Sequence, residues 1–261
     1  VFIPLCINKP KADLIGTKMQ ERYLGDVHDF LKYAFIKHIY RETNFCLGLN
    51  WYLSDPNIVD PIDNNDGEVR YHLKNERWKN WDDSLFIQLQ KFSAPSNRTL
   101  KQFYKLNILP AETVYFDQWV PCNGRTKWHK RAINKLKLTD HVFLDPDNGA
   151  EIKSMTRRTS AKYILFDEIK DYIDSGIAVT FSQFARQYSP QKRAQEVLDL
   201  CLDKLDYCCS LPTLFNHVSP SLLFVSLAPP HKADLLKHSV MTFALNSPKM
   251  NNVSSQVTLI E

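Results

Sequence analysis

The chain has 261 residues, of which 44% are hydrophobic and 24% charged, and its formal net charge is +4. This composition is typical of a soluble globular protein and argues against a disordered or fibrous chain. No apolar run approaches the ~18 residues that a membrane-spanning helix needs, so we expect a cytoplasmic protein with no membrane partner. The mildly basic balance permits nucleic-acid binding without requiring it.

The length favours a single domain with an insertion. Residues 1–18 lack the apolar core of a signal peptide and are interpreted as an N-terminal extension. Residues 19–261 are predicted to form the domain, with an inserted loop and helical region at about 54–110. The six cysteines show neither a CxxC pair nor the spacing of a zinc site, so we expect reduced thiols.

The first elements are a helix, a strand and an acidic loop. Apolar residues at helical spacing predict a helix over 20–43, on which Asp29 and Lys32 lie three positions apart as a surface ion pair. The continuous apolar run at 44–53 predicts a buried strand. The acidic stretch 54–68 is interpreted as a solvated loop, with a lid over the site as one use of it.

The rest of the chain alternates between helical and strand patterns. Trp78 and Trp81 are interpreted as covers of a core edge, with base stacking as the alternative. Helices are predicted at 98–107, 124–138, 162–175, 190–205 and 231–245, and strands at 112–119, 142–144, 177–184, 221–228 and 256–260. This alternation predicts a Rossmann-like α/β fold whose mainly parallel sheet has helices on both faces.

The stretch HVFLDPDNG, residues 141–149, marks the candidate active site. Its apolar residues run directly into Asp145, Pro146, Asp147 and Asn148, which is typical of a buried strand that ends in a polar turn. Ligands of open α/β sheets bind at the carboxyl ends of strands, so these four residues are candidate catalytic residues. Two neighbouring carboxylates would repel each other unless a cation, a metal or a proton shares the site.

Cations flank this strand in sequence on both sides. They are predicted either to form a solvated face or to neutralise the phosphates of a bound RNA or DNA. The candidate nucleic-acid-binding residues are Arg125, Lys127, Lys130, Arg157 and Arg158.

Two chemistries suit the acidic strand end. In methyl transfer to an exocyclic nitrogen, Asp145 and the carbonyl of Pro146 accept hydrogen bonds from the amino group. In phosphodiester hydrolysis, Asp145 and Asp147, with Glu151 or Glu168, hold Mg²⁺. A non-catalytic Rossmann-like binding module is the third hypothesis.

The order of these features resembles a known family. A segment that precedes the first strand is similar to the motif GNxADVLKH of the bacterial 23S ribosomal RNA adenine-N6 methyltransferases of the J type. The matching residues are Gly25, Asp29, Leu31 and Lys32, with Asp26 in place of Asn and Tyr33 in place of the last His. A strand ending in Asp, a DPP-type strand and a late strand ending in Pro229-Pro230 follow in the same order, so the likeness spans about residues 22–245.

The resemblance implies a methyltransferase fold and S-adenosylmethionine as cofactor. It implies that Asp145 and Pro146 are catalytic and that Asp117 contacts the adenosyl group. Lys32 and the segment with Gly25, Asp26 and Asp29 would border the cofactor pocket. The chain departs from the family in two places: no glycine-rich turn follows the first strand, and Asn148 replaces the aromatic residue that stacks on a flipped adenine.

Overall fold

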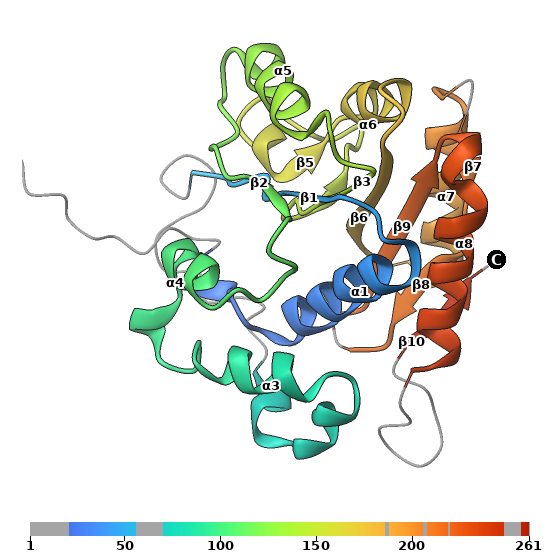
Figure 1. Cartoon of the computed structure of the whole chain (residues 1–261). Helices are drawn as coiled ribbons and strands as arrows, with labels where there is room; N and C mark the ends of the chain where they lie inside the picture. The colour runs from blue at the N-terminus through green and yellow to red at the C-terminus, as the bar shows by residue number, and fades with distance from the viewer. Residues whose placement is uncertain are drawn as a thin grey trace, which may run out of the picture.

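The computed structural model describes residues 21–55, 70–185, 188–205, 208–218, 220–247 and 257–260. The predicted N-terminal extension and nearly all of the acidic loop, residues 56–68, lie outside this part of the chain. The described residues form an α/β structure around an eight-stranded mixed sheet (Figure 1), which confirms the predicted Rossmann-like fold. No helix in these residues is long and apolar enough to cross a membrane.

The elements follow the predicted alternation. The helices are α1 Val27–Thr43, α3 Asp83–Gln90, α4 Leu100–Lys105, α5 Arg125–Leu136, α6 Phe166–Asp174, α7 Pro190–Leu202 and α8 Pro230–Leu245. The strands are β1 Leu47–Asn50, β2 Val114–Phe116, β3 His141–Leu144, β4 Gly149–Ala150, β5 Tyr163–Ile164, β6 Ala178–Phe184, β7 Cys209–Ser210, β8 Thr213–Asn216, β9 Leu222–Ala228 and β10 Val257–Ile260.

The main sheet has the order β10-β8-β9-β6-β3-β1-β2, with β7 beside β9. The pairs β2-β1, β1-β3 and β3-β6 are parallel, and β9 is antiparallel to β6, β7 and β8. The strands β6 and β8 therefore point the same way, and only β9 and β10 of this sheet are reversed. From β1 the chain adds β2 on one side and then returns to add β3 on the other, so the order of strands reverses at β1.

Two apolar cores lie on the two faces of the sheet. One contains the buried residues of α1 and α8 and the other those of α5, α6 and α7. Successive strand residues point to opposite faces, so Phe143 packs in the α1 core, whereas Val142 and Leu144 pack in the α5 core. Asp145, the next residue after Leu144, therefore emerges on the α1 face.

The described part of the segment between β1 and β2 contains α3, α4 and short 3-10 turns, and α3 packs on α1 (Figure 1). Trp78 is only 1% exposed and packs edge-on against Phe30, with ring centroids 5.2 Å apart. Trp81 packs against Phe243 at 5.0 Å. Trp81 thus covers the edge of the core, as predicted, whereas Trp78 lies within the core and is too buried to stack on a base.

Some element boundaries differ from the sequence prediction for local reasons. The first helix begins at Val27, because Asp26 caps it by accepting a hydrogen bond from the backbone N–H of Asp29. The helix predicted over 162–175 begins at Phe166, because Tyr163 and Ile164 pair with β4. The strands β7 and β8 were not predicted. They are two and four residues long, and together they span only residues 209–216.

Candidate functional site

A cavity of about 300 Å³ lies at the carboxyl ends of β1, β3 and β6, on the α1 face of the sheet. Trp51 and Leu53 line it after β1, Asp145 after β3, and Phe184 at the end of β6. This is the edge at which open α/β sheets bind ligands, next to the point where the strand order reverses. The volume is at the small end of the range for small-molecule sites.

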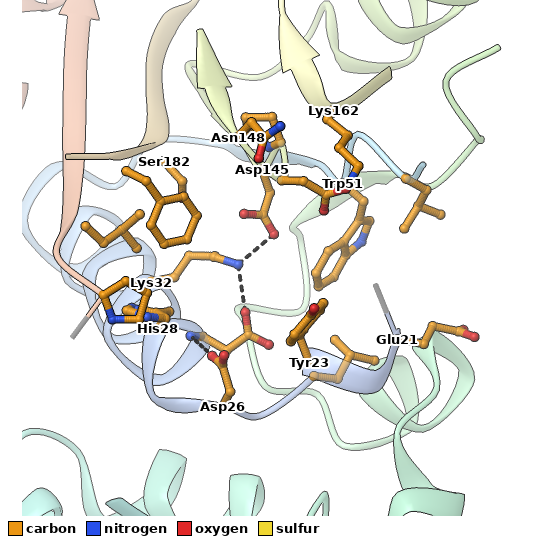
Figure 2. A pocket seen from close by; sticks show the side chains of 18 of the residues that line it. Glu21, Tyr23, Asp26, His28, Lys32, Trp51, Asp145, Asn148, Lys162 and Ser182 are labelled. Atoms are coloured by element: carbon orange, nitrogen blue, oxygen red, sulfur yellow. Dashed lines mark hydrogen bonds and ion pairs between the residues drawn. The ribbon is translucent and has the colours of Figure 1, made fainter. Parts of the chain in front are cut away.

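A buried ion pair occupies the middle of this cavity (Figure 2). The Nζ of Lys32 donates to Asp29 Oδ1 at 2.7 Å and to Asp145 Oδ2 at 2.6 Å. The three side chains are 7%, 9% and 15% exposed. The prediction of a surface ion pair between Asp29 and Lys32 is therefore wrong, since the sheet, α8 and the insertion pack around α1 and leave little of this helix exposed.

The first turn of α1 holds these charges in place. Asp29 Oδ2 accepts hydrogen bonds from the N–H of Gly25 and the hydroxyl of Tyr33, both at 2.9 Å. Gly25 has φ +77°, and a Cβ there would lie 2.8 Å from Phe92, so this turn requires glycine. Of the predicted cofactor residues on this segment, Asp26, Asp29 and Lys32 line the cavity. Gly25 does not line it but orients Asp29 through the backbone hydrogen bond.

The acidic groups of the cavity have shifted pKa values. Burial raises the pKa of Asp145 to about 6; Lys32 opposes this shift, and the charges of Asp29 and Asp147 add to it. Burial, with the charge of Asp29, raises the pKa of Asp26 to about 8. Burial alone would lower the pKa of Lys32, but Asp145 and Asp29 raise it above its usual value, so the ammonium stays charged. At neutral pH Asp145 is a carboxylate that accepts hydrogen bonds.

The remaining predicted catalytic residues, Pro146, Asp147 and Asn148, also line the cavity. Asp147 Oδ2 accepts a hydrogen bond from the Ser54 hydroxyl at 2.6 Å, and the N–H of Asn148 donates to the carbonyl of Lys162 at 2.9 Å. These contacts join the turn after β3 to the segments after β1 and before β5, so the whole predicted stretch forms one wall of the cavity.

Asp117 is not brought to this cavity. It follows β2 and accepts a hydrogen bond from the Tyr104 hydroxyl at 3.0 Å. Together with Lys135 it lines a separate hollow between α4 and the β2 edge. The predicted adenosyl contact therefore lies outside the cavity that contains Asp145 and Lys32.

Arg125, predicted to bind nucleic acid, is instead part of a closed buried cluster. Its Nε and Nη2 donate to the two oxygens of Glu168 at 2.7 and 2.8 Å, and Nη1 donates to the carbonyl of Ser160 at 2.6 Å. Glu168 also accepts from the hydroxyl of Tyr52. The prediction for Arg125 is wrong, because its guanidinium is used to attach α5 to α6 and to the preceding loop. The other four predicted cations, Lys127, Lys130, Arg157 and Arg158, are exposed.

The acidic partners predicted for Mg²⁺ also lie elsewhere. Glu168 is held by Arg125, and Glu151 Oε1 accepts from the N–H of Phe166 at 2.9 Å. Neither residue lines the cavity. In the described part of the chain, no three His, Cys, Asp or Glu side chains form a group that could hold a metal ion. The predicted metal set of Asp145 and Asp147 with Glu151 or Glu168 therefore does not assemble in these residues.

Sequence reasoning missed Ser182 and Phe184 of the cavity, and it included His28 only as part of the segment from Gly25 to Asp29 without giving it a role. His28 lies one helical turn before Lys32, and that spacing is the signal that places it on the same side of α1. Ser182 is one of three polar residues of β6, with Thr180 and Gln183, and the alternation of strand residues places it on the same face as Thr180. It lies one position after Phe181, which pairs with Leu144, so Ser182 neighbours Asp145 at the sheet edge.

Comparison with known proteins shows no relationship for this chain. The chain matches none of the protein-family models and no curated protein.

Proposed function

We propose that the protein is a diverged S-adenosylmethionine-dependent methyltransferase that acts on an amino group of a nucleic-acid base. The observation that carries the proposal is the contact between Lys32 and Asp145. These residues are 113 positions apart in the chain and belong to the two motifs on which the family resemblance depends. Their side chains meet in one cavity, at the sheet edge where this fold binds ligands.

The charge of the cavity supports a cationic ligand. Its lining includes the carboxyl groups of Glu21, Asp26, Asp29, Asp145 and Asp147, against the two ammonium groups of Lys32 and Lys162. Carboxylates outnumber ammonium groups even when Asp26 is protonated, as its raised pKa favours. A sulfonium cofactor with a flat purine ring fits an acidic cavity whose walls also include aromatic and leucine side chains.

The residues of the chain have separate roles in this proposal. Asp145 and the backbone carbonyl of Pro146 accept hydrogen bonds from the amino group and hold its lone pair in a fixed direction. Lys32 orients the Asp145 carboxylate, and the packed walls limit the access of water. Asp26, Asp29 and Lys32 are the residues that would hold the cofactor. When bound, the cofactor supplies an electrophilic methyl group.

Calorimetry with S-adenosylmethionine tests the proposal directly. We expect saturable binding to the wild type, and the same affinity within about threefold for Asp145→Asn, whose methyl transfer to RNA or DNA falls by about 10²–10³-fold. Asp234→Asn, the same change at an exposed position of α8, is the matched control and should alter neither quantity. Absence of binding by folded wild type would refute the proposal. Binding without transfer would indicate the non-catalytic module.

A further inference from the structure

His28 and Ser182 are among the buried polar side chains of the cavity that have no hydrogen-bond partner within the described residues. His28 is 7% exposed and Ser182 3%, and neither the two ring nitrogens nor the hydroxyl finds a donor or acceptor. Buried polar groups are almost always paired, because the loss of their water is otherwise uncompensated. His38, on the same helix, shows the usual arrangement, since its Nε2 contacts the carbonyl of Ser239 at 3.1 Å and the hydroxyl of Thr242 at 3.0 Å.

The two groups belong to the same wall as Asp145. Ser182 neighbours Asp145 across the β3-β6 pair, and Phe184 follows two residues later on the same face of β6. The ring of His28 meets Phe184 edge-on, with centroids 5.8 Å apart. In the view of Figure 2, His28 and Ser182 lie on one side of the Lys32 ammonium, and Trp51 and Tyr23 lie on the other.

The protonation state of this wall defines what it can recognise. Burial lowers the pKa of His28 to about 4, and the charge of Lys32 adds to this shift against the opposing effect of Asp29. The imidazole is therefore neutral at pH 7 and has one donor and one acceptor nitrogen. The Ser182 hydroxyl likewise donates and accepts. Next to a phenyl ring, such groups complement an uncharged planar ring that has donor and acceptor atoms on its edge, as a nucleobase has.

We propose that His28, Ser182 and Phe184 form the subsite that recognises the base whose amino group is held at Asp145. This inference rests on the proposed function and specifies its substrate. The family motif has alanine at the position of His28, so the subsite is a feature of this chain. Phe184 supplies an aromatic ring to the site, where the turn after β3 has Asn148 in place of the aromatic residue of the family.

The experiment measures adenosine binding to the full chain by calorimetry. We expect His28→Leu to weaken binding about tenfold or more and Ser182→Ala about threefold, since each change removes a hydrogen-bonding partner of the base. The structure offers matched controls. His72 and Ser239 are also buried, and the ring nitrogens of His72 and the hydroxyl of Ser239 have no hydrogen-bond partner among the described residues. Neither residue lines the cavity. His72→Leu and Ser239→Ala should leave adenosine binding within twofold of the wild type, and thermal unfolding verifies that each variant is folded.

The outcomes separate this inference from the proposed function. Unchanged adenosine binding by folded His28→Leu, or no adenosine binding by the wild type, would overturn the inference even if S-adenosylmethionine binds. His28-dependent adenosine binding supports it even if S-adenosylmethionine does not bind. Addition of S-adenosylhomocysteine then distinguishes the two sources of a base: simultaneous binding supports the substrate base, and competition with adenosine would overturn that assignment.

Discussion

Two buried ion-pair clusters lie on opposite faces of the same sheet and differ in how completely they are closed. Around Arg125, all three guanidinium nitrogens donate to Glu168 or to backbone carbonyls, and Glu168 also accepts from Tyr52 and from the N–H of Leu165. In the cluster around Lys32, the Asp145 side chain accepts a hydrogen bond from Lys32 and from no other described residue. This cluster borders a cavity.

This difference is the one expected between a cluster that only connects helices and one that can also contact a ligand. A buried charge needs both a counter-ion and further hydrogen bonds to offset the loss of its hydration. Arg125 and Glu168 have both within the protein, and they connect α5 to α6. Asp145 has the counter-ion but keeps acceptor capacity that a ligand in the cavity can use. Burial therefore does not separate Asp145 from Glu168, whereas incomplete pairing next to a cavity does.

The largest expected effect is the loss of stability when the closed cluster is opened. Arg125→Ala leaves Glu168 buried without its cation, which costs about 3–5 kcal/mol of unfolding free energy. Chemical denaturation measures this value. Arg131 lies on the same helix as Arg125 but is exposed, and Arg131→Ala, which removes only its contact with Gln118, should cost no more than about 0.5 kcal/mol. Equal costs for the two variants would contradict the structural role of Arg125.

A smaller loss, which depends on pH, is expected in the open cluster. Lys32→Met removes the cation that stabilises ionised Asp145, so the pKa of Asp145 rises further and the carboxyl group becomes protonated at neutral pH. The unfolding free energy of the variant should therefore fall below that of the wild type by about 2–3 kcal/mol at pH 8 and by less at pH 5. Denaturation at the two pH values measures the difference. A deficit that grows towards pH 5 would contradict this account.

The unfolding free energy of the wild type should also depend on the protonation of Asp145. Folding raises the pKa of Asp145 from 3.8 to about 6, so the folded state binds this proton more tightly than the unfolded state. The contribution of this group to stability is greatest below pH 4 and is lost as the pH rises through 6.

The pH dependence of methyl transfer tests whether the Asp145 carboxylate accepts a hydrogen bond from the amino group of the substrate. Because Asp145 must be ionised to accept from the amino group, kcat/KM should rise about tenfold per pH unit below 6 and level off above it. A profile that is flat between pH 5 and pH 8, with S-adenosylmethionine bound throughout, would show that this proton does not control the reaction.

The smallest effect on stability is expected at the exposed basic face of α5. Lys127→Glu combined with Lys130→Glu should change the unfolding free energy by no more than about 0.5 kcal/mol, because both side chains are exposed. If these lysines contact phosphates, binding of a single-stranded RNA probe weakens, and its dependence on salt falls by about one counter-ion per lost contact. Lys237→Glu, an exposed position of α8, is the control.

The sequence was sufficient for the fold class and for one wall of the site. The apolar runs and helical spacings predicted the alternation of strands and helices, and the run into Asp145 placed the catalytic candidates at a strand end. These features are local, so they can be read without knowledge of distant contacts. The family resemblance added Lys32, which lies at the same cavity.

What the sequence could not supply depends on tertiary packing. Spacing showed that Asp29 and Lys32 share a helix face but not that this face is buried, because the covering residues come from distant segments of the chain. The charge of Arg125 looked like that of its neighbours Lys127 and Lys130, although only Arg125 points to the loop before α6. The sequence also could not show that His28 and Ser182 lack hydrogen-bond partners, because hydrogen bonding of buried side chains depends on the folded core.

The carboxylates that cap α1 also line the cavity, so local unfolding at the start of this helix disrupts the site. The N–H groups of Gly25 and Asp29 donate to the carboxylates of Asp29 and Asp26, so two cavity acids also protect amide protons of the first helical turn. Exchange of these protons with deuterium requires the turn to open, which would also release Lys32 from its partners. A ligand that binds only the closed turn must slow this exchange in proportion to its occupancy. The amides of Gly25 and Asp29 are therefore internal reporters of occupancy, readable before any substrate has been identified.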